Sequence, residues 1–572
     1  MEENKNMKSF ISDAVDCKGG PADRTTTGGW VSAALILGIE VSERLSTMGI
    51  FVNLVTYLIH TMHLPSATSS NIVTNAVGTA FLLSLLGGII ADSFLGRYWT
   101  ITASALIHAL GTCMLAISAA PKLRPPPCDP SSSGVCGEAS KMQMTMFYIA
   151  VYTIAVGIGG IKSSVPGFGT DQFDQKDEKE KDEMAQFFSR YYLIISIGTL
   201  LAVTVIVYIQ DHVGRTWGYG ICAASMFLAV FAFLVGTKRY RYKKCVSSPI
   251  IQILQVIVAA IRKRKAELPS DDSFLFEKSS PETSIPHTDQ YSWLDKGAII
   301  SSRERGPDGS TIRNPWRLCT VTKVEEVKML IKIMPIFATT FLFWTIHAQM
   351  LGYSVAQCFT LNRSIRSFDI PPASFNAFYI GSIVINLTLY DRIIVPFWKQ
   401  SSKGAQGFTN LQEIGMGLFF ATLGMAVASL VEMRRLYIVR VTRDPTTTLP
   451  MNAFFLVPQF ILVGIGGTFM YTGQLNFFIT QSPKGMKALG TGLFLTTTAL
   501  GFFGSSILVT VVKKVTGTHG WLTPNINNSR LDCFYALLAV LGSIDLGLYM
   551  ICAGRYKAHP VENADKPNSG KV

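Results

Sequence analysis

The chain has 572 residues, of which 48% are hydrophobic and only 16% are charged, and its mean hydropathy is +0.31. Soluble domains carry about 25% charged residues, so the composition excludes an ordinary soluble domain and indicates a membrane protein. The net charge of +13 comes from basic residues between apolar runs, which suits cytoplasmic loops that face anionic lipid rather than a nucleic acid.

Twelve apolar runs of about 20 residues or more follow one another along the chain, as membrane-spanning helices do. We expect the spans at residues 30–59, 70–91, 99–120, 143–167, 186–209, 217–236, 327–350, 371–396, 410–432, 451–479, 488–512 and 531–553. The first run is too long for the apolar part of a signal peptide, so we expect it to remain as an uncleaved span. The sequence therefore predicts an all-α membrane protein.

A long polar stretch divides the twelve runs into two sets of six. The expected parts are a cytoplasmic N-terminus (1–29), an N-terminal six-helix lobe (30–236), a linker (237–326), a C-terminal six-helix lobe (327–553) and a C-terminal tail (554–572). The linker is rich in lysine and arginine, so the positive-inside rule puts it and both termini in the cytoplasm. Within it, Pro249 to Ile261 is expected to form an amphipathic helix on the membrane surface.

Two observations bear on this topology. Gly88-Ile-Ile-Ala-Asp92-Ser-Phe-Leu-Gly96-Arg97 lies between the second and third runs, and it resembles the loop signature of the major facilitator superfamily. In two-lobed transporters of this kind the substrate site lies between the lobes, near the midplane. Against the topology, four arginines fall after the ninth run, in a loop that should face outward: Arg434, Arg435, Arg440 and Arg443.

Three charged side chains, Glu40, Glu43 and Arg44, interrupt the first run. Positions i, i+3 and i+4 share one helix face, so these side chains form one cluster. Each charge costs about 2.5–3.5 kcal/mol at the bilayer centre, which favours a polar cavity that handles a proton or a charged solute. The alternative is a Glu40–Arg44 salt bridge that only fixes helix packing, but we expect that bridge to leave one glutamate unpaired.

Two further polar residues lie in apolar runs. Lys162 lies in a glycine-rich fourth run, either as a cation facing the cavity or as a lysine that reaches the membrane surface. His347 lies late in the seventh run, where it is either a donor to a small anion or a satisfied core histidine. No metal-ligand cluster, nucleophile triad or phosphate-binding loop appears, so we expect a protein that is not an enzyme and that has no cofactor.

Several motifs resemble one transporter family. Glu40-x-x-Glu43-Arg44 resembles the E-x-x-E-R signature of the proton-coupled oligopeptide transporters, and the stretch from Gln186 to Leu200 resembles that family's fifth-span motif. Asp171-Gln-Phe-Asp174 and Tyr471-Thr-Gly-Gln-Leu also fit. The wider sequence is similar to the plant nitrate/peptide transporter branch, closest to the dual-affinity nitrate transporter subgroup.

The resemblance implies site residues. Glu40, Glu43, Arg44 and Lys162 would take part in proton coupling, and His347 matches the histidine that binds nitrate. Five residues match positions that line the nitrate pocket: Met48, Val52, Val77, Leu351 and Tyr379. Thr100 matches a phosphorylated threonine, with Arg97 three residues before it as many kinases require; the alternative is a buried hydroxyl bonded to the preceding helical turn.

The sequence departs from the family in the tenth run. Gly467 stands where relatives usually carry a glutamate, and Asn476 replaces the usual acidic residue. Lys162 loses its expected partner, so it is deprotonated, pairs with Glu40 or Glu43, or holds an anion. The missing glutamate weakens the peptide-transport interpretation and, we expect, makes the site more attractive to small anions.

We therefore expect a plasma-membrane symporter that imports nitrate with protons by alternating access. The alternatives are a chloride or plant hormone transporter of the same family, a nitrate sensor that signals through the linker and Thr100, and an anion channel. Expected partners are nitrate, protons, membrane lipid and a protein kinase at Thr100; chloride and a homodimer remain open. Cys128 and Cys136 flank a short loop in which a disulfide is a further open alternative.

Overall fold

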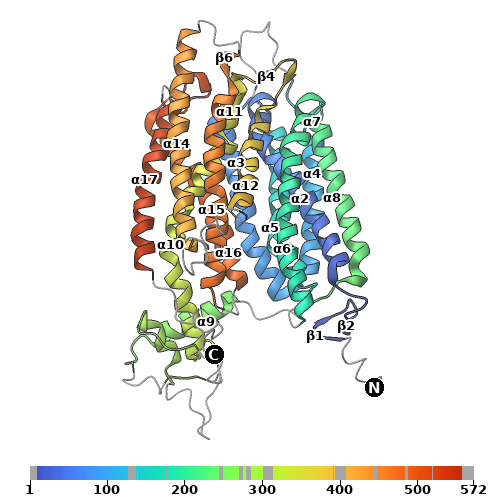
Figure 1. Cartoon of the computed structure of the whole chain (residues 1–572), viewed down its shortest axis with the longest axis vertical. Coiled ribbons are helices and arrows are strands. Elements are labelled where there is room, and N and C mark those ends of the chain that lie inside the picture. The colour runs from blue at the N-terminus through green and yellow to red at the C-terminus, as the bar shows by residue number, and fades with distance from the viewer. Residues whose placement is uncertain are drawn as a thin grey trace.

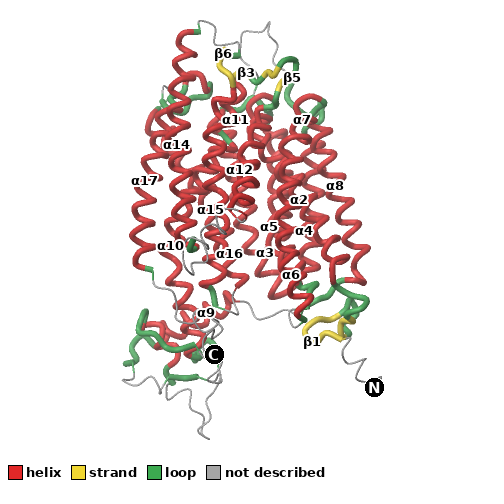
Figure 2. Tube along the Cα trace, in the orientation of Figure 1, coloured by secondary structure: helices red, strands yellow, loops and turns green. Residues whose placement is uncertain are grey.

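The computed structural model describes residues 10–126, 137, 139–174, 177–243, 249–268, 275–277, 285–300, 314–390, 392, 408–442, 448–483, 487–517 and 520–556. Every structural statement below concerns these residues. Long, roughly parallel helices dominate this part of the chain, and the short strands lie at the two ends of the molecule (Figure 2). Cys128, Cys136 and Arg443 lie outside it.

Six long helical segments form the N-terminal half (Figure 1). They are α2 (Gly29–His60), α3 (Ser66–Ile90) continued by η1 (Ala91–Leu95), α4 (Arg97–Ser118), α5 (Lys141–Thr170), α6 (Glu178–Leu201) continued by η2 (Ala202–Ile206) and α7 (Val207–His212), and α8 (Arg215–Val235) followed by η3 (Gly236–Arg239). The start of α5 follows from local sequence, because Ser140 and Gln143 form a reciprocal capping box.

Six more form the C-terminal half. They are α10 (Val321–Leu351) with α11 (Tyr353–Thr360), η7 (Pro372–Phe375) with α12 (Asn376–Leu389), α14 (Asn410–Val441), η9 (Ala453–Leu456) with α15 (Val457–Gln481), α16 (Lys487–Thr516), and η11 (Ile526–Asn528) followed by α17 (Leu531–Arg555). Three two-stranded sheets complete the described structure. β1 (Phe10–Val15) pairs with β2 (Pro21–Asp23) and β4 (Ser364–Ile365) with β5 (Phe368–Asp369), both antiparallel, and β3 (Leu361–Asn362) pairs with β6 (Leu449–Asn452) in parallel.

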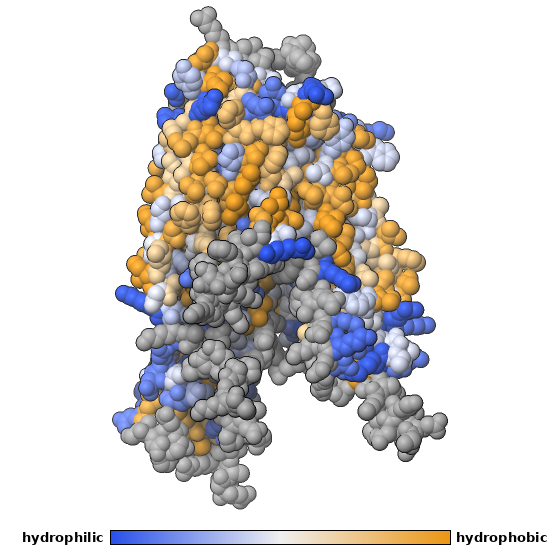
Figure 3. All heavy atoms as spheres, in the orientation of Figure 1, coloured by the Kyte–Doolittle hydropathy of each residue, from blue (hydrophilic) through white to orange (hydrophobic). Residues whose placement is uncertain are grey.

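The predicted spans are recovered. Eleven helices of the described chain are long and apolar enough to cross a membrane. The first predicted span, α2, is not among them, because Glu40, Glu43 and Arg44 lower its hydropathy. Figure 3 shows apolar side chains over the middle of the visible face and hydrophilic ones gathered toward both ends, as a protein immersed in lipid requires.

The linker forms a small unit attached to the start of α10. Its helix α9 (Pro249–Arg262) and the 3₁₀ turn η5 (Ser292–Ala298) share an apolar core with the beginning of α10. Lys328 of α10 lies 2.7 Å from Asp295 and 2.8 Å from Glu325, and it donates to the Thr288 carbonyl at 2.6 Å. The predicted helix in the linker is therefore present, and its buried face packs against protein.

The two halves meet along α3 and α16, and further contacts gather at the end away from β1 and α9 (Figure 1). There His60 of α2 stacks on Phe359 of α11, with ring centroids 3.7 Å apart. Ser66 donates to the Pro524 carbonyl at 3.2 Å, and Asn71 donates to Thr510 at 3.0 Å. These contacts close that end of the interface between the halves.

One of the arginines that argued against the predicted topology has a structural explanation, and Arg434 and Arg440 remain exposed on the same helix. Arg434, Arg435 and Arg440 lie inside α14, which extends to Val441, rather than in a loop. Arg435 is fully buried and forms a bidentate pair with Glu432, at 2.7 and 2.8 Å. Its charge is therefore compensated within the helix, and the positive-inside rule does not apply to it.

Candidate functional site

The charged cluster of the first span lies inside the bundle. Glu40 and Glu43 are fully buried, and Arg44 Nε lies 3.2 Å from Glu40 and 3.5 Å from Glu43. Both carboxylates therefore share one guanidinium. The expectation that one glutamate would remain without a cation is wrong, because the i, i+3 and i+4 spacing lets Arg44 reach both.

Lys162 joins this cluster from α5. Its Nζ lies 3.3 Å from Glu43 Oε1, and its side chain is only 6% exposed. The lysine therefore pairs with Glu43 and does not reach the membrane surface, which selects one of the alternatives left open by the sequence. Two carboxylates and two cations make the cluster formally neutral, as a buried charge group must be.

Hydroxyl groups surround the two carboxylates unequally. Thr47 donates to Glu43 Oε1 at 2.8 Å, and Tyr191 hydrogen-bonds to the side chain of Glu40. Glu40 Oε2 and Glu43 Oε2 are both buried without a hydrogen bond in the described part of the chain, although Arg44 Nε lies 3.5 Å from Glu43 Oε2. A carboxylate oxygen with a free acceptor position is a suitable place for a proton to bind.

His347 of α10 lies in an aromatic pocket in the C-terminal half. Its ring centroid is 5.1 Å from Tyr379, 5.7 Å from Trp344 and 6.0 Å from Phe502. His347 Nδ1 is buried and has no hydrogen-bond partner among the described residues. Gln474 orients the pocket wall, because it accepts the Trp344 indole N–H at 3.1 Å.

The residues predicted to line the pocket converge on the interface between the halves. Met48 and Val52 of α2 share one apolar cluster with Leu351 and Tyr379 of the C-terminal half. Val77 of α3 lies in the neighbouring cluster, which Leu351 also contacts. The structure therefore brings positions from α2 and α3 together with Leu351 and Tyr379 of the C-terminal half, and Tyr379 is also in contact with His347.

Two phenylalanines separate the charged cluster from the histidine pocket. Lys162 Nζ lies 5.8 Å from the ring centroid of Phe81, Phe81 stacks on Phe502 at 6.0 Å, and Phe502 meets His347 at 6.0 Å. We call Phe81 and Phe502 the aromatic septum. Lys162 and His347 are thus linked through two stacked aromatic rings.

Comparison with known proteins identifies the family. A model of the POT family matches residues 98–522. Two relatives from Arabidopsis thaliana align along nearly the whole chain: Protein NRT1/PTR FAMILY 6.2, 56% identical over 98% of this chain and 97% of its own, and Protein NRT1/PTR FAMILY 6.3, 50% identical over 96% and 94%. The chain belongs to the POT family.

Solved structures support the fold independently. A crystal structure of an auto-inhibited POT family peptide transporter covers 95% of this chain and 99% of its own, with a TM-score of 0.68 at 20% identity. At that identity the likeness concerns the fold alone. The twelve-helix arrangement is that of a major facilitator transporter, and the chain is a multi-pass, proton-coupled transporter of the POT family and not an enzyme.

Gly467 of α15 makes room for an α12 side chain. A Cβ at this position would lie 2.9 Å from the Tyr379 hydroxyl oxygen. The Tyr379 hydroxyl therefore lies directly over the position from which any side chain at residue 467 would project. Since Lys162 is paired with Glu43 within its own half, the structure compensates its charge without the missing glutamate.

Thr100 lies within α4 and is 4% exposed. Its hydroxyl donates to the Gly96 carbonyl at 3.0 Å, the bond to the preceding turn that the sequence left as an alternative. A kinase reaches this hydroxyl only if the start of α4 moves away from α5, because the methyl group of Thr100 lies close to Gly160.

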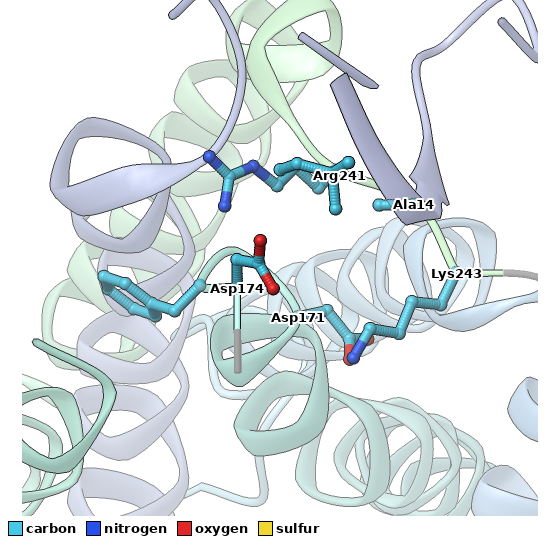
Figure 4. A pocket seen from close by; sticks show the side chains of 7 residues that line it. Ala14, Asp171, Asp174, Arg241 and Lys243 are labelled. Atoms are coloured by element: carbon cyan, nitrogen blue, oxygen red, sulfur yellow. The ribbon is translucent and has the colours of Figure 1, made fainter. Parts of the chain in front are cut away.

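The loop motif between the second and third spans takes part in a charge cluster near the N-terminal segment. Arg97 lies 3.1 Å from Asp92 and 2.8 Å from Asp171, and Lys243 lies 3.2 Å from Asp171. Figure 4 shows Asp171 and Lys243 pointing toward one another. The motif therefore fixes the start of α4 to the end of α5.

The same cluster holds the N-terminal segment in place. Arg241, 2% exposed, pairs with Glu180 at 2.6 Å and donates to the Thr27 carbonyl at 3.1 Å. Arg24 pairs with Asp174. Arg241 and Asp174 are the facing side chains in Figure 4. No sequence pattern distinguishes Arg241 from the many other basic residues of the linker.

One group of residues has metal-ligand chemistry. His287, Asp295 and Glu325 lie close enough together to share an ion. Lys328 Nζ binds Asp295 and Glu325 at 2.7 and 2.8 Å. Its ammonium group thus takes the position of the cation, and we assign no metal to this group.

Proposed function

We propose that this POT family member is a symporter that imports nitrate together with protons. His347 is the observation that carries the proposal. A small anion needs a hydrogen-bond donor in a site without competing carboxylates, and His347 offers a ring nitrogen without a partner, at the interface between the halves. Gly467 supports the same interpretation, since a glutamate there would repel an anion beside Tyr379.

The proton-handling groups in this proposal are Glu40, Glu43, Arg44 and Lys162. Protonation of one carboxylate breaks the charge balance of the cluster and frees one of the two cations. The aromatic septum keeps that event out of direct contact with the anion. Coupling therefore operates through a rocking motion of the two halves, which we assign to residues 30–236 and 327–553, with residues 237–326 as the connecting linker.

The membrane potential bears on the direction of nitrate transport and on its coupling to protons. We propose a plasma-membrane location with both termini and the linker in the cytoplasm, which puts the closed end around His60 and Phe359 on the outside. A negative interior opposes anion entry by about 2.3 kcal/mol per charge at 100 mV. Uptake of nitrate against this potential is easiest with more than one proton per anion.

The deciding experiment measures uptake of nitrate and of chloride in oocytes at external pH 5.5 and 7.5, for the wild type and for His347→Tyr. Loss of one charged or strong hydrogen bond costs about 1.5–3 kcal/mol, so we expect nitrate uptake by His347→Tyr to fall about tenfold or more. Met334→Leu, on the exposed side of the same helix, is the matched control. Unchanged nitrate uptake in His347→Tyr would remove the main support for the substrate.

The same experiment separates the alternatives. Chloride is the competing anion, because it would use the same nitrogen and hydroxyl donors; stronger chloride than nitrate uptake would favour it, and uptake of neither would favour a hormone. Currents that reverse at the anion potential and do not depend on pH would favour a channel. Signalling that persists in a transport-inactive variant would favour a nitrate sensor.

We also propose that phosphorylation of Thr100 regulates transport. The support is its position beside the Arg97 cluster, where an added phosphoryl group would compete with Asp92 and Asp171 for the guanidinium. Because the hydroxyl is buried, modification would accompany loosening of α4 from α5. Phosphopeptide mass spectrometry of the protein from induced plant membranes tests this, and an unmodified Thr100 under all nitrate supplies would contradict it.

A further inference from the structure

His108 is a fully buried histidine of α4 to which the transport cycle proposed above gives no role. Its Nε2 lies 2.9 Å from the Ser46 hydroxyl of α2. Ser46 Oγ in turn lies 3.4 Å from Thr112 Oγ1. Nδ1 is buried and has no hydrogen-bond partner among the described residues, and His108 packs against Gly157 of α5. The imidazole therefore connects α2, α4 and α5 at one point inside the N-terminal half.

The backbone of α5 fixes the position of this ring. A Cβ on Gly157 would lie 2.5 Å from His108 Cβ and 2.6 Å from its backbone nitrogen. The two helices are in backbone contact at this point, so the imidazole cannot retreat toward α5 and is directed toward α2. A glycine at a helix crossing of this kind is a common device for close helix approach in membranes.

Ser46 belongs to the same helical turn as the proton-handling cluster. Glu43 lies three residues before it, and Thr47, which donates to Glu43 at 2.8 Å, follows it directly. Positions three and four apart lie on one helix face. A bond that fixes Ser46 therefore also fixes the direction in which Glu43 and Thr47 project from α2.

The charged groups that act on the imidazole are Glu43 of α2 and Lys162 of α5. α8 also packs on α4, and its buried Cys222 faces the Leu45 carbonyl of α2 at 3.9 Å rather than the ring. The electrical environment of His108 is thus set by the same ion pair, Lys162 with Glu43, that lies at the centre of the cluster.

We propose that His108 is a positioning residue for proton binding: through its hydrogen bond with Ser46 it holds the α2 turn so that Glu43 remains bonded to Thr47 and Lys162. Both bonds stabilise the ionised carboxylate. Without the anchor they weaken, and Glu43 binds its proton at a higher pH. The inference rests on the proposed role of Glu43 in proton coupling.

The test compares the external pH of half-maximal anion uptake in oocytes for the full-length wild type, His108→Leu, His108→Gln and Ser46→Ala. We expect His108→Leu and Ser46→Ala to shift this pH upward by about 0.5–1 unit, the contribution of one hydrogen bond. His108→Gln, whose amide can still bond Ser46, should restore the wild-type profile. Thr102→Val is the matched control, because Thr102 is a buried α4 hydroxyl that bonds only to its own helix, at the Tyr98 carbonyl.

The outcomes separate this inference from the proposed function. A profile of Ser46→Ala that superimposes on that of the wild type overturns the role of His108, and so does an equal shift in Thr102→Val. Ser46→Ala adds no volume, so it keeps the test open if His108→Leu does not reach the membrane. Glu43→Gln tests the proposed role of Glu43 itself. If the pH dependence of uptake is unchanged in this variant, the proton-coupling role of Glu43 is wrong. If Glu43→Gln loses pH dependence but Ser46→Ala shows no shift, only the role of His108 is wrong.

Discussion

Glu40 and Glu43 are adjacent on one helix face but occupy different environments. Glu40 is bonded to Arg44 and Tyr191, whereas Glu43 is bonded to Thr47, Arg44 and Lys162. In the described part of the chain each carboxylate has one buried oxygen without a hydrogen bond, and Glu43 is the one that two cations approach. The surroundings of His347 in the C-terminal half differ from this charged cluster. They are aromatic, and His347 Nδ1 has no hydrogen-bond partner among the described residues.

At the residue scale, Gly467→Glu tests whether the missing carboxylate sets anion preference. We expect anion uptake to fall at least about tenfold, because a buried negative charge beside Tyr379 disfavours a second one and each 1.4 kcal/mol is a factor of ten. The measurement is nitrate uptake across external pH. Gly467→Ala adds the Cβ that approaches Tyr379 without the charge, so an equal loss in both variants would attribute the effect to steric contact.

At the element scale, the crossing of α4 and α5 depends on small residues. A Cβ on Gly160 would lie 1.9 Å from Ser104 Oγ, and one on Gly111 would lie 2.7 Å from the Ile154 nitrogen. Lipid tails supply no hydrophobic drive between helices, so close backbone contact is the main attraction available. This crossing also carries Lys162 and His108, and its geometry therefore determines the site.

Gly160→Val should prevent this crossing from closing. Overpacking of a close contact costs about 1–3 kcal/mol, and the neighbour here includes the Thr100 methyl group as well as Ser104. We expect the amount of folded protein at the cell surface, measured by size-exclusion of a fluorescent fusion, to fall severalfold. Gly220→Ala on α8, which has open space around it, should behave as the wild type; a normal profile for Gly160→Val would contradict the role of this crossing.

The linker unit is a second element with a specific attachment. Lys328 is 3% exposed and holds Asp295 and Glu325 together. Burial raises the pKa of Asp295, and the hydrogen bonds from Lys328 and His287 oppose that effect. The linker therefore moves with α10, and its attachment depends on a buried ammonium group.

Lys328→Met should release the linker from α10. Removing one partner of a buried ion pair leaves uncompensated charge and costs about 3–5 kcal/mol. Limited proteolysis of the purified protein should then cleave within residues 285–300 at least ten times faster than in the wild type. Lys323→Met, one turn earlier on α10, is the control, and equal protection of both variants would show that the apolar core alone holds the linker.

At the scale of the whole molecule, the two halves meet along the length of α3 and α16, and aromatic pairs add to this contact at the end away from β1 and α9. His60 and Phe359 stack there, and Tyr208 stacks on Phe368 with centroids 5.7 Å apart. Below them lies the apolar cluster that contains Val52 and Leu351. In the rocking motion proposed above, both layers would separate to open that end.

Weakening the outer layer should expose the pocket. In the double variant His60→Ala/Phe359→Ala, loss of an aromatic pair contributes about 0.5–1.5 kcal/mol, which corresponds to a twofold to tenfold change in population. A thiol reagent added outside should label Val52→Cys faster by that factor in this background. The same background without Val52→Cys corrects for native cysteines, and unchanged labelling would contradict the proposed gate and its outward orientation.

The sequence by itself determined the spans, the shared face of Glu40, Glu43 and Arg44, and the family. These features follow from local hydrophobic periodicity and from short motifs, both of which can be recognised in a single sequence. The tertiary structure decided which groups meet: Lys162 with Glu43 rather than with an anion, Arg435 with Glu432 inside α14, and His108 with Ser46. Hydrophobic periodicity does not specify how one membrane helix is rotated against the next, because an apolar side chain can face either lipid or another helix. Glycine contacts and buried ion pairs fix that rotation, and they appear only when the helices are packed together.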